Sequence, residues 1–289
     1  MAQPLPSSGE NGAMASGEVV VAERDRRTPS ELLFPPSPSV RLLQYLLAVV
    51  APAAATAGFF VLHQPLWSTL GLALLSLAGY ANPRLKRALA FTRALFAFCA
   101  LTMVINSLGI AYPYSNIFVL TGMLALFSFS GMEWRGLHFQ AGQTQRWSAP
   151  AILFGLALSA VILGVFYLVP KWIGGNPTPS SWPVDVLAVV ALGYATYSAL
   201  MEETIFRGLL LAYGRQSMQM PLAIAAQAAV FGAMHYQAGF PNHAAGAVLA
   251  FIWAAIAGWL VSKSGSIFPA IVLHFVLVLT MFLVLAFVL

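Results

Sequence analysis

Nine apolar runs, each long or nearly long enough to cross a lipid bilayer as a helix, dominate this chain of 289 residues. Hydrophobic residues make up 60% of it and charged residues only 8%, more apolar surface than one water-soluble core can bury. A spanning helix needs about 20 apolar residues, so the second and fourth runs are marginal. The sequence predicts an all-α polytopic membrane protein with about eight or nine transmembrane helices in one bundle, at 42–62, 66–82, 89–111, 116–132, 149–170, 184–212, 221–239, 243–261 and 267–289.

Residues 1–40 differ in kind from the rest of the chain. They are rich in Ser, Pro, Gly, Glu and Arg and contain the charged stretch "ERDRRTPSE", but no apolar run of the type found in signal peptides. Such a composition cannot bury enough apolar surface to fold by itself. We therefore predict a disordered polar N-terminal tail over 1–40 and a transmembrane helical domain over 41–289.

The charged residues between the apolar runs predict a topology. Every second connection is basic, while the opposite connections carry little charge apart from Lys171 and Asp185. By the positive-inside rule the N-terminus is cytoplasmic and, with nine spans, the C-terminus is external. We expect an integral protein of the bacterial inner (plasma) membrane whose net charge of +5 reflects topology, with the lipid bilayer and no nucleic acid as a partner. The basic residues are Arg24, Arg26, Arg27, Arg41, Arg84, Lys86, Arg87, Arg135, Arg146, Arg215 and Lys263.

Two carboxylates and a guanidinium interrupt the sixth run, in "ALMEETIFRGLLLAYG" at 199–214. An ionisable side chain in a spanning helix costs about 2.5–3.5 kcal/mol, so it usually faces the bundle interior and has a partner. Glu203 and Arg207 are four residues apart and predict an ion pair on one helical face. Glu202 is turned about 100° away and is suited to act as a general base. The structural alternative is a buried Glu–Arg pair that only fixes helix register.

Two intramembrane histidines favour a shared chemical site. In "FGAMH", Phe231 lies one helical turn before His235, so an aromatic ring is expected beneath the imidazole. In "PAIVLHF", His274 lies at mid-depth in the last run. Two histidines and a carboxylate pair on three different helices, in a chain with so few polar residues, predict one site rather than separate packing interactions.

These motifs together resemble the CPBP family, the CAAX-protease and bacteriocin-processing intramembrane peptidases that include the Ras-converting endopeptidase. "EETIFR" matches its EExxxR motif, "FGAMH" its FxxxH motif and "SGSIFPAIVLH" the start of its last motif, in the family's order and within 184–280. The resemblance implies an intramembrane endopeptidase in which Glu202 and His235 activate water, Glu203 and Arg207 support them, and His274 stabilises the oxyanion. Its substrate would be a membrane-associated protein or peptide, and an enzyme that trims prenylated C-termini would face the cytosol.

One position departs from the family pattern. The last motif usually has Asn or Asp four residues after its histidine, and this chain has Val278 there, which donates no hydrogen bond. One missing oxyanion donor is worth about 2.7–4 kcal/mol in enzymes that depend on it. Asn106, on the third run, is the first candidate for a substitute donor. A non-catalytic immunity or scaffold protein of the same fold therefore stays an alternative.

Other intramembrane chemistries fit the residues less well. A zinc protease of the HExxH type needs a His-Glu pair that this chain lacks. An aspartyl protease needs two intramembrane aspartates, but the aspartates of this chain lie in the tail or at the edge of an apolar run. No metal or cofactor is favoured because Arg207 engages Glu203, although two carboxylates and two histidines make zinc, and thus a metalloprotease, an open alternative. A proton-coupled transporter uses similar residues and is the remaining alternative.

Overall fold

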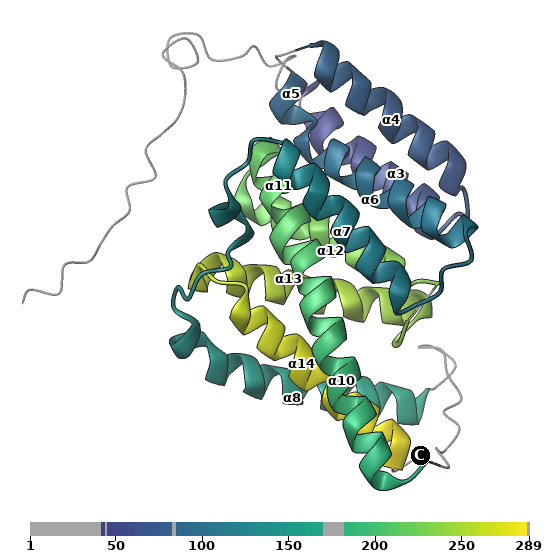
Figure 1. The fold of residues 1–289 in the computed structure, drawn as a ribbon, viewed down its shortest axis with the longest axis vertical. Coiled ribbons are helices and arrows are strands. Elements are labelled where there is room, and N and C mark those ends of the chain that lie inside the picture. Colours follow the sequence, from purple (N-terminus) through teal and green to yellow (C-terminus); the bar gives the residue numbers. More distant parts are fainter. Residues whose placement is uncertain (1–41, 44, 83–84, 170–181, 238, 288–289) are drawn as a thin grey trace, which may run out of the picture.

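A computed structural model describes residues 42–287 except 44, 83–84, 170–181 and 238 (Figure 1). The predicted N-terminal tail lies outside the described residues, as do Lys171 and the basic residues that precede the first helix.

Long helices follow the predicted apolar runs in order (Figure 1). The shorter elements are a 3-10 helix, a four-residue helix and two π-helical segments that continue into neighbouring α-helices. The elements are η1 (Leu46–Val50), α3 (Ala51–Phe60), α4 (Pro65–Ala81), α5 (Leu85–Ala88), α6 (Ala90–Ser107), α7 (Tyr114–Phe129), η2 (Trp134–Leu137), α8 (Thr144–Leu168), α10 (Val184–Glu203), η3 (Thr204–Leu210), α11 (Leu211–Ser217), α12 (Met220–Met234), α13 (His243–Ser264) and α14 (Phe268–Phe287).

Five of these helical segments are long and apolar enough to cross a membrane. They are α6, α8, the continuous 34-residue segment Val184–Ser217, α13 and α14. Four shorter apolar helices of 10–17 residues accompany them: Leu46–Phe60, α4, α7 and α12. The prediction of an all-helical membrane protein is confirmed, whereas the count of eight or nine crossings stays a prediction.

The seventh helix ends earlier than predicted. The apolar run suggests a helix to residue 239, but α12 ends at Met234 and His235 caps it. Gly239 has a positive φ of 90°, which favours glycine, and Pro241 has no backbone N–H to continue a helical ladder. His235 consequently lies at the end of its helix rather than within it.

Four connections meet at one end of the bundle, and hydrogen bonds join them. These connections, α4 to α6, α7 to α8, α11 to α12 and α13 to α14, are called the basic end below. The Ser217 hydroxyl donates to the Arg87 carbonyl (3.0 Å), and the Ile267 N–H donates to the His138 carbonyl (3.0 Å). Among the described residues all Lys and Arg except Arg207 lie there or within about one helical turn of it: Lys86, Arg87, Arg93, Arg135, Arg146, Arg215 and Lys263.

Three connections, α3 to α4, α6 to α7 and α12 to α13, lie at the opposite end. His63, after α3, lies 3.3 Å from the Gln237 amide nitrogen, after α12. The Tyr197 hydroxyl of α10 donates to the Pro113 carbonyl, before α7. Figure 1 shows the two sets of connections on opposite sides of the view, left for the basic end and right for the other. The alternation of charge in the sequence therefore corresponds to two distinct ends in space.

Candidate active site

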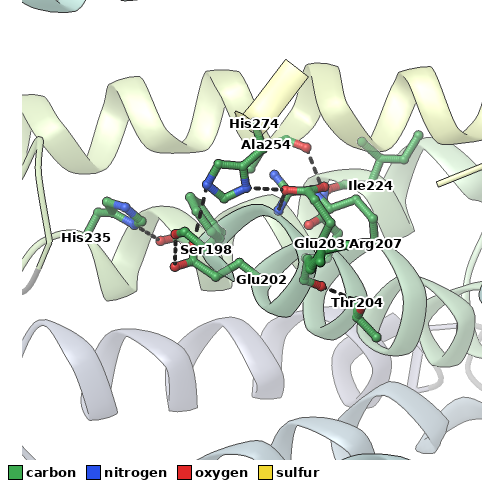
Figure 2. A network of polar contacts seen from close by, with 12 residues as sticks. Ser198, Glu202, Glu203, Thr204, Arg207, Ile224, His235, Ala254 and His274 are labelled. Carbon is green, nitrogen blue, oxygen red and sulfur yellow. Dashed lines mark hydrogen bonds and ion pairs between the residues drawn. The ribbon is translucent and has the colours of Figure 1, made fainter. Parts of the chain in front are cut away.

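The centre of the candidate site is a buried ion pair joined to a histidine (Figure 2). Arg207 Nη1 lies 3.2 Å from Glu203 Oε1, and neither side chain is exposed. The same carboxylate oxygen accepts a hydrogen bond from His274 Nδ1 at 2.8 Å. The predicted Glu203–Arg207 pair is present, and it connects α10 to α14 through His274.

A π-helical segment, η3, forms the turn that carries the ion pair. Glu203 is the last residue of α10, and Arg207 lies within η3 (Thr204–Leu210), all of whose residues are buried. A π-helix has i→i+5 hydrogen bonds and thus a wider turn than an α-helix, and such segments occur frequently at functional sites. The apolar periodicity of the sequence gives no signal for it.

Aromatic rings enclose the guanidinium of Arg207. Its central carbon lies 4.4 Å from the centroid of Trp253 and 4.9 Å from that of Phe231. A cation over an aromatic face is stabilised by about 2 kcal/mol or more when it is removed from water. Arg207 is therefore held by one carboxylate and two rings from neighbouring helices.

Glu202 has different surroundings from Glu203. Its side chain is 14% exposed, compared with 0% for Glu203. One of its oxygens accepts a hydrogen bond from the Ser198 hydroxyl at 3.1 Å, and the other lies 3.9 Å from His274 Nε2. Figure 2 shows Glu202 directed toward Ser198 and away from Arg207. The two adjacent glutamates thus divide into a buried, paired one and an accessible one.

His235 is oriented by the residue one turn before it. Its Nδ1 lies 3.0 Å from the Phe231 carbonyl, which only accepts, so Nδ1 carries the proton and Nε2 of the neutral ring is an acceptor. The two rings are 4.5 Å apart with an interplanar angle of 33°, as the spacing predicted. A side chain at Gly239 would come within 3.5 Å of Nε2, so the glycine leaves that edge open.

A cavity of about 1120 Å³ brings the predicted site residues together. Glu202, His235 and His274 line it, and so do Val278 and Asn106. Glu203 and Arg207 are fully buried behind the wall that Glu202 and His274 form. The structure therefore places the three residues expected to contact substrate on one cavity and the two supporting residues beneath it.

The donor groups present suit a metal ion poorly. His274 Nδ1 and the Arg207 cation already occupy Glu203 Oε1, so this carboxylate oxygen is not free to bind a metal ion. Within the described residues, no three His, Cys, Asp or Glu side chains converge in a geometry that could hold a metal ion.

Sequence reasoning missed two residues of the site. Ser198 precedes Glu202 by four residues, so helical spacing alone could have found this hydrogen bond. Trp253, on α13, contacts both Arg207 and His274, with ring centroids of Trp253 and His274 4.7 Å apart. No motif marks it, because its position depends on how α13 packs. Gln227 donates to the Ala254 carbonyl at 3.0 Å and joins α12 to α13.

Comparison with known proteins agrees with the motifs. Residues 183–280 match a family model described as type II CAAX prenyl endopeptidase, Rce1-like. A search of curated proteins and a search of solved structures each found no match. The matched range contains α10, η3, α11, α12, α13 and most of α14, and therefore both glutamates, Arg207 and the two histidines. Over this region the integral membrane protein has the sequence pattern of the Rce1-like CAAX protease family, and the resemblance expected from the motifs is confirmed.

Proposed function

We propose that the protein is an intramembrane endopeptidase of the CAAX-protease type that hydrolyses a peptide bond with a glutamate- and histidine-activated water. The observation that carries the proposal is the cavity on which Glu202, His235 and His274 lie together, each held by one hydrogen bond, from Ser198, to the Phe231 carbonyl and to Glu203 respectively. A membrane protease family and several apolar helices support a membrane-associated protein or peptide as substrate.

A water molecule between Glu202 and His235 has two acceptors. The Glu202 carboxylate accepts one O–H, and His235 Nε2 accepts the other, since Nδ1 holds the ring proton. Glu202 removes a proton as the water oxygen attacks the carbonyl carbon of the substrate. The tetrahedral intermediate then expels the amine as the C–N bond breaks, and Glu202 returns the proton to the leaving nitrogen.

His274 is placed to stabilise the negative oxygen of that intermediate. Its Nδ1–H is committed to Glu203, so the ring donates a second hydrogen bond from Nε2 only as the imidazolium. Glu203 Oε1 lies 2.8 Å from Nδ1 of this ring, and Glu202 Oε2 lies 3.9 Å from its Nε2. Arg207 balances the charge of Glu203, which keeps this buried group of charges close to neutral.

A non-catalytic immunity or scaffold role is the second candidate, and Val278 is the observation that favours it. Val278 lines the cavity one turn after His274, at the position where a second side-chain donor is expected. Asn106 lines the same cavity and is the proposed substitute.

The test compares peptide termini of membrane and secreted proteins in cells that express the wild-type protein or Glu202→Gln. We expect a set of new termini that requires Glu202. Equal sets of termini, with any cellular phenotype preserved in Glu202→Gln, would favour the scaffold role. Loss of a proton-dependent transport phenotype without any change in termini would instead favour the transporter alternative.

A further inference from the structure

The position of the cavity relative to the basic end bears on where the substrate comes from. On several helices, the cavity is lined by the end that is farther from the basic end. On α6 the lining residues include Asn106, near its last residue, and on α12 they include His235, at its end. On α7 and α13, which begin at the opposite end, they include Ser115 and Leu249, both in the first two turns.

The connections at the opposite end form the rim of the cavity. His63 and Gln237, which contact each other, both line it and are exposed. Tyr112, 44% exposed, also lines it and packs on Tyr194 with ring centroids 5.9 Å apart. The floor is closed by buried groups, since Ser198, Phe231, Trp253 and His274 are each at most 4% exposed. Exposure therefore rises from the catalytic group toward the opposite end.

Charge assigns the two ends to the two sides of the membrane. Among the described residues, every cation except the buried Arg207 lies at or near the basic end. Cytoplasmic connections carry the excess of Lys and Arg in membrane proteins, so the basic end is the cytoplasmic one. The rim then faces away from the cytoplasm.

The cavity wall also restricts the kind of substrate. Of the described lining residues, Glu202 is the only acid, and none is Lys or Arg. Phe, Met, Leu, Ile and Val side chains form much of the surface. Such a cavity accommodates an apolar, extended segment better than a charged one.

We propose that the peptide bond reaches Glu202 from the non-cytoplasmic face of the membrane, within an apolar segment of an exported or membrane-inserted protein. The substrate named in this inference rests on the proposed function. The direction in which the cavity opens does not depend on that function. It differs from the cytosol-facing arrangement implied by resemblance to enzymes that trim prenylated C-termini.

The test is the accessibility of single cysteines in intact cells. Cys99 is the only cysteine and is buried, so Cys99→Ala gives a background in which Gln237→Cys reports the rim, Thr102→Cys the cavity and Lys263→Cys the basic end. Cells are treated with a small membrane-impermeant cationic methanethiosulfonate, and the remaining thiols are then counted by a polyethylene glycol maleimide gel shift. We expect the rim and cavity cysteines to be blocked in intact cells and the Lys263→Cys thiol only after permeabilisation.

The reverse pattern, with Lys263→Cys blocked in intact cells and the other two protected, would overturn the proposal. So would a cavity cysteine that reacts from neither side while the rim reacts from outside, because the cavity would then be closed to water. Labelling requires no proteolysis, so repeating it with Glu202→Gln separates the direction of the opening from the peptidase function. Unchanged labelling with no Glu202-dependent termini would leave the opening established and the peptidase function refuted.

Discussion

His274 Nδ1 lies 2.8 Å from Glu203 Oε1, and the other nitrogen of the same ring lies 3.9 Å from Glu202 Oε2. One imidazole therefore spans two adjacent carboxylates that differ in exposure and in partners. Helix α14 thereby contacts both the accessible and the buried member of the pair. This relationship makes the effects of substitutions at the two glutamates separable.

Glu202→Gln is expected to abolish cleavage with little change in protein abundance, because the side chain lines the cavity and its amide still hydrogen bonds to Ser198. Glu203→Gln removes the charge that pairs with Arg207, and breaking a buried pair costs about 3–5 kcal/mol. Immunoblots and thermal unfolding in detergent should show lower abundance and lower stability for Glu203→Gln alone. Equal abundance and stability of both variants would contradict this division of roles.

His274→Ala is expected to lower the cleavage rate by about 10² or more, since it removes a side-chain donor from the oxyanion. Val278→Asn adds an amide on the same cavity wall, one helical turn away, and is expected to maintain or raise the rate. Rates are measured on one reporter substrate in membranes with matched protein amounts. Loss of activity in Val278→Asn at normal abundance would show that Val278 packs against substrate, with Asn106 then tested as the existing donor.

Trp253→Leu should destabilise the protein by about 2 kcal/mol or more, because it removes a buried ring from the Arg207 guanidinium. Trp259→Leu is the matched control on the same helix, since Trp259 is 43% exposed and contacts Trp147 rather than the ion pair. Thermal unfolding of both variants in one detergent provides the comparison. A larger loss for Trp259→Leu would remove the proposed role of the aromatic enclosure.

Gly232→Ala should destabilise the contact between α12 and α13 by about 1–3 kcal/mol. A Cβ there would come within 2.7 Å of the Ala247 carbonyl oxygen and 2.9 Å of the Phe251 Cβ, so the helices would have to separate. Gly193→Ala, inside α10 with no neighbour within 4 Å, is expected to be neutral or to stabilise by about 0.4–1 kcal/mol. Unfolding midpoints that change alike in both variants would contradict the packing argument.

Stability should fall in acid through His138, which lies in the α7 to α8 connection. Burial, and then the Arg215 cation, hold the pKa of His138 below its ordinary value of 6.5. The unfolded chain then binds the proton more readily, so the free energy of unfolding decreases as the pH falls below about 6.5.

His138→Asn removes this titration, and Asn tolerates the positive φ of 59° at that position. The comparison is the difference in unfolding midpoint between pH 7.5 and pH 5 for each protein, with both pH values chosen about 1 unit or more from the reference pKa. The decrease in unfolding midpoint from pH 7.5 to pH 5 should be smaller in the variant. An equal decrease in both proteins would assign the acid sensitivity to other groups.

The order and type of the helices were predictable because apolar runs in a membrane have only one local solution, the helix. The ends were less predictable. α8 begins at Thr144, five residues before its apolar run, since "TQRWS" is polar but helical. α12 ends five residues before its run does, because Gly239 and Pro241 follow.

The candidate site was predictable to the extent that rare polar residues mark it. Glu202, Glu203, His235 and His274 are conspicuous because the surrounding sequence is apolar. Trp253 is one of seven tryptophans and has no such contrast. Its role depends on the packing of α13 against α12 and η3, which no local pattern encodes.

The wide turn at Thr204–Leu210 lies within one 34-residue helical segment and sets how the parts before and after it are rotated relative to each other. Before it, Glu202 faces the cavity, and after it, Arg215 reaches His138, 3.1 Å from its Nε2. A π-helical turn holds about one residue more than an α-helical turn, so deleting one residue and restoring α-helical geometry would leave the helix beyond it facing the same way. A regular α-helix of the same length would instead turn Arg215 by about 100° relative to Glu202, so the wide turn lets one helical segment serve both the cavity and the basic end.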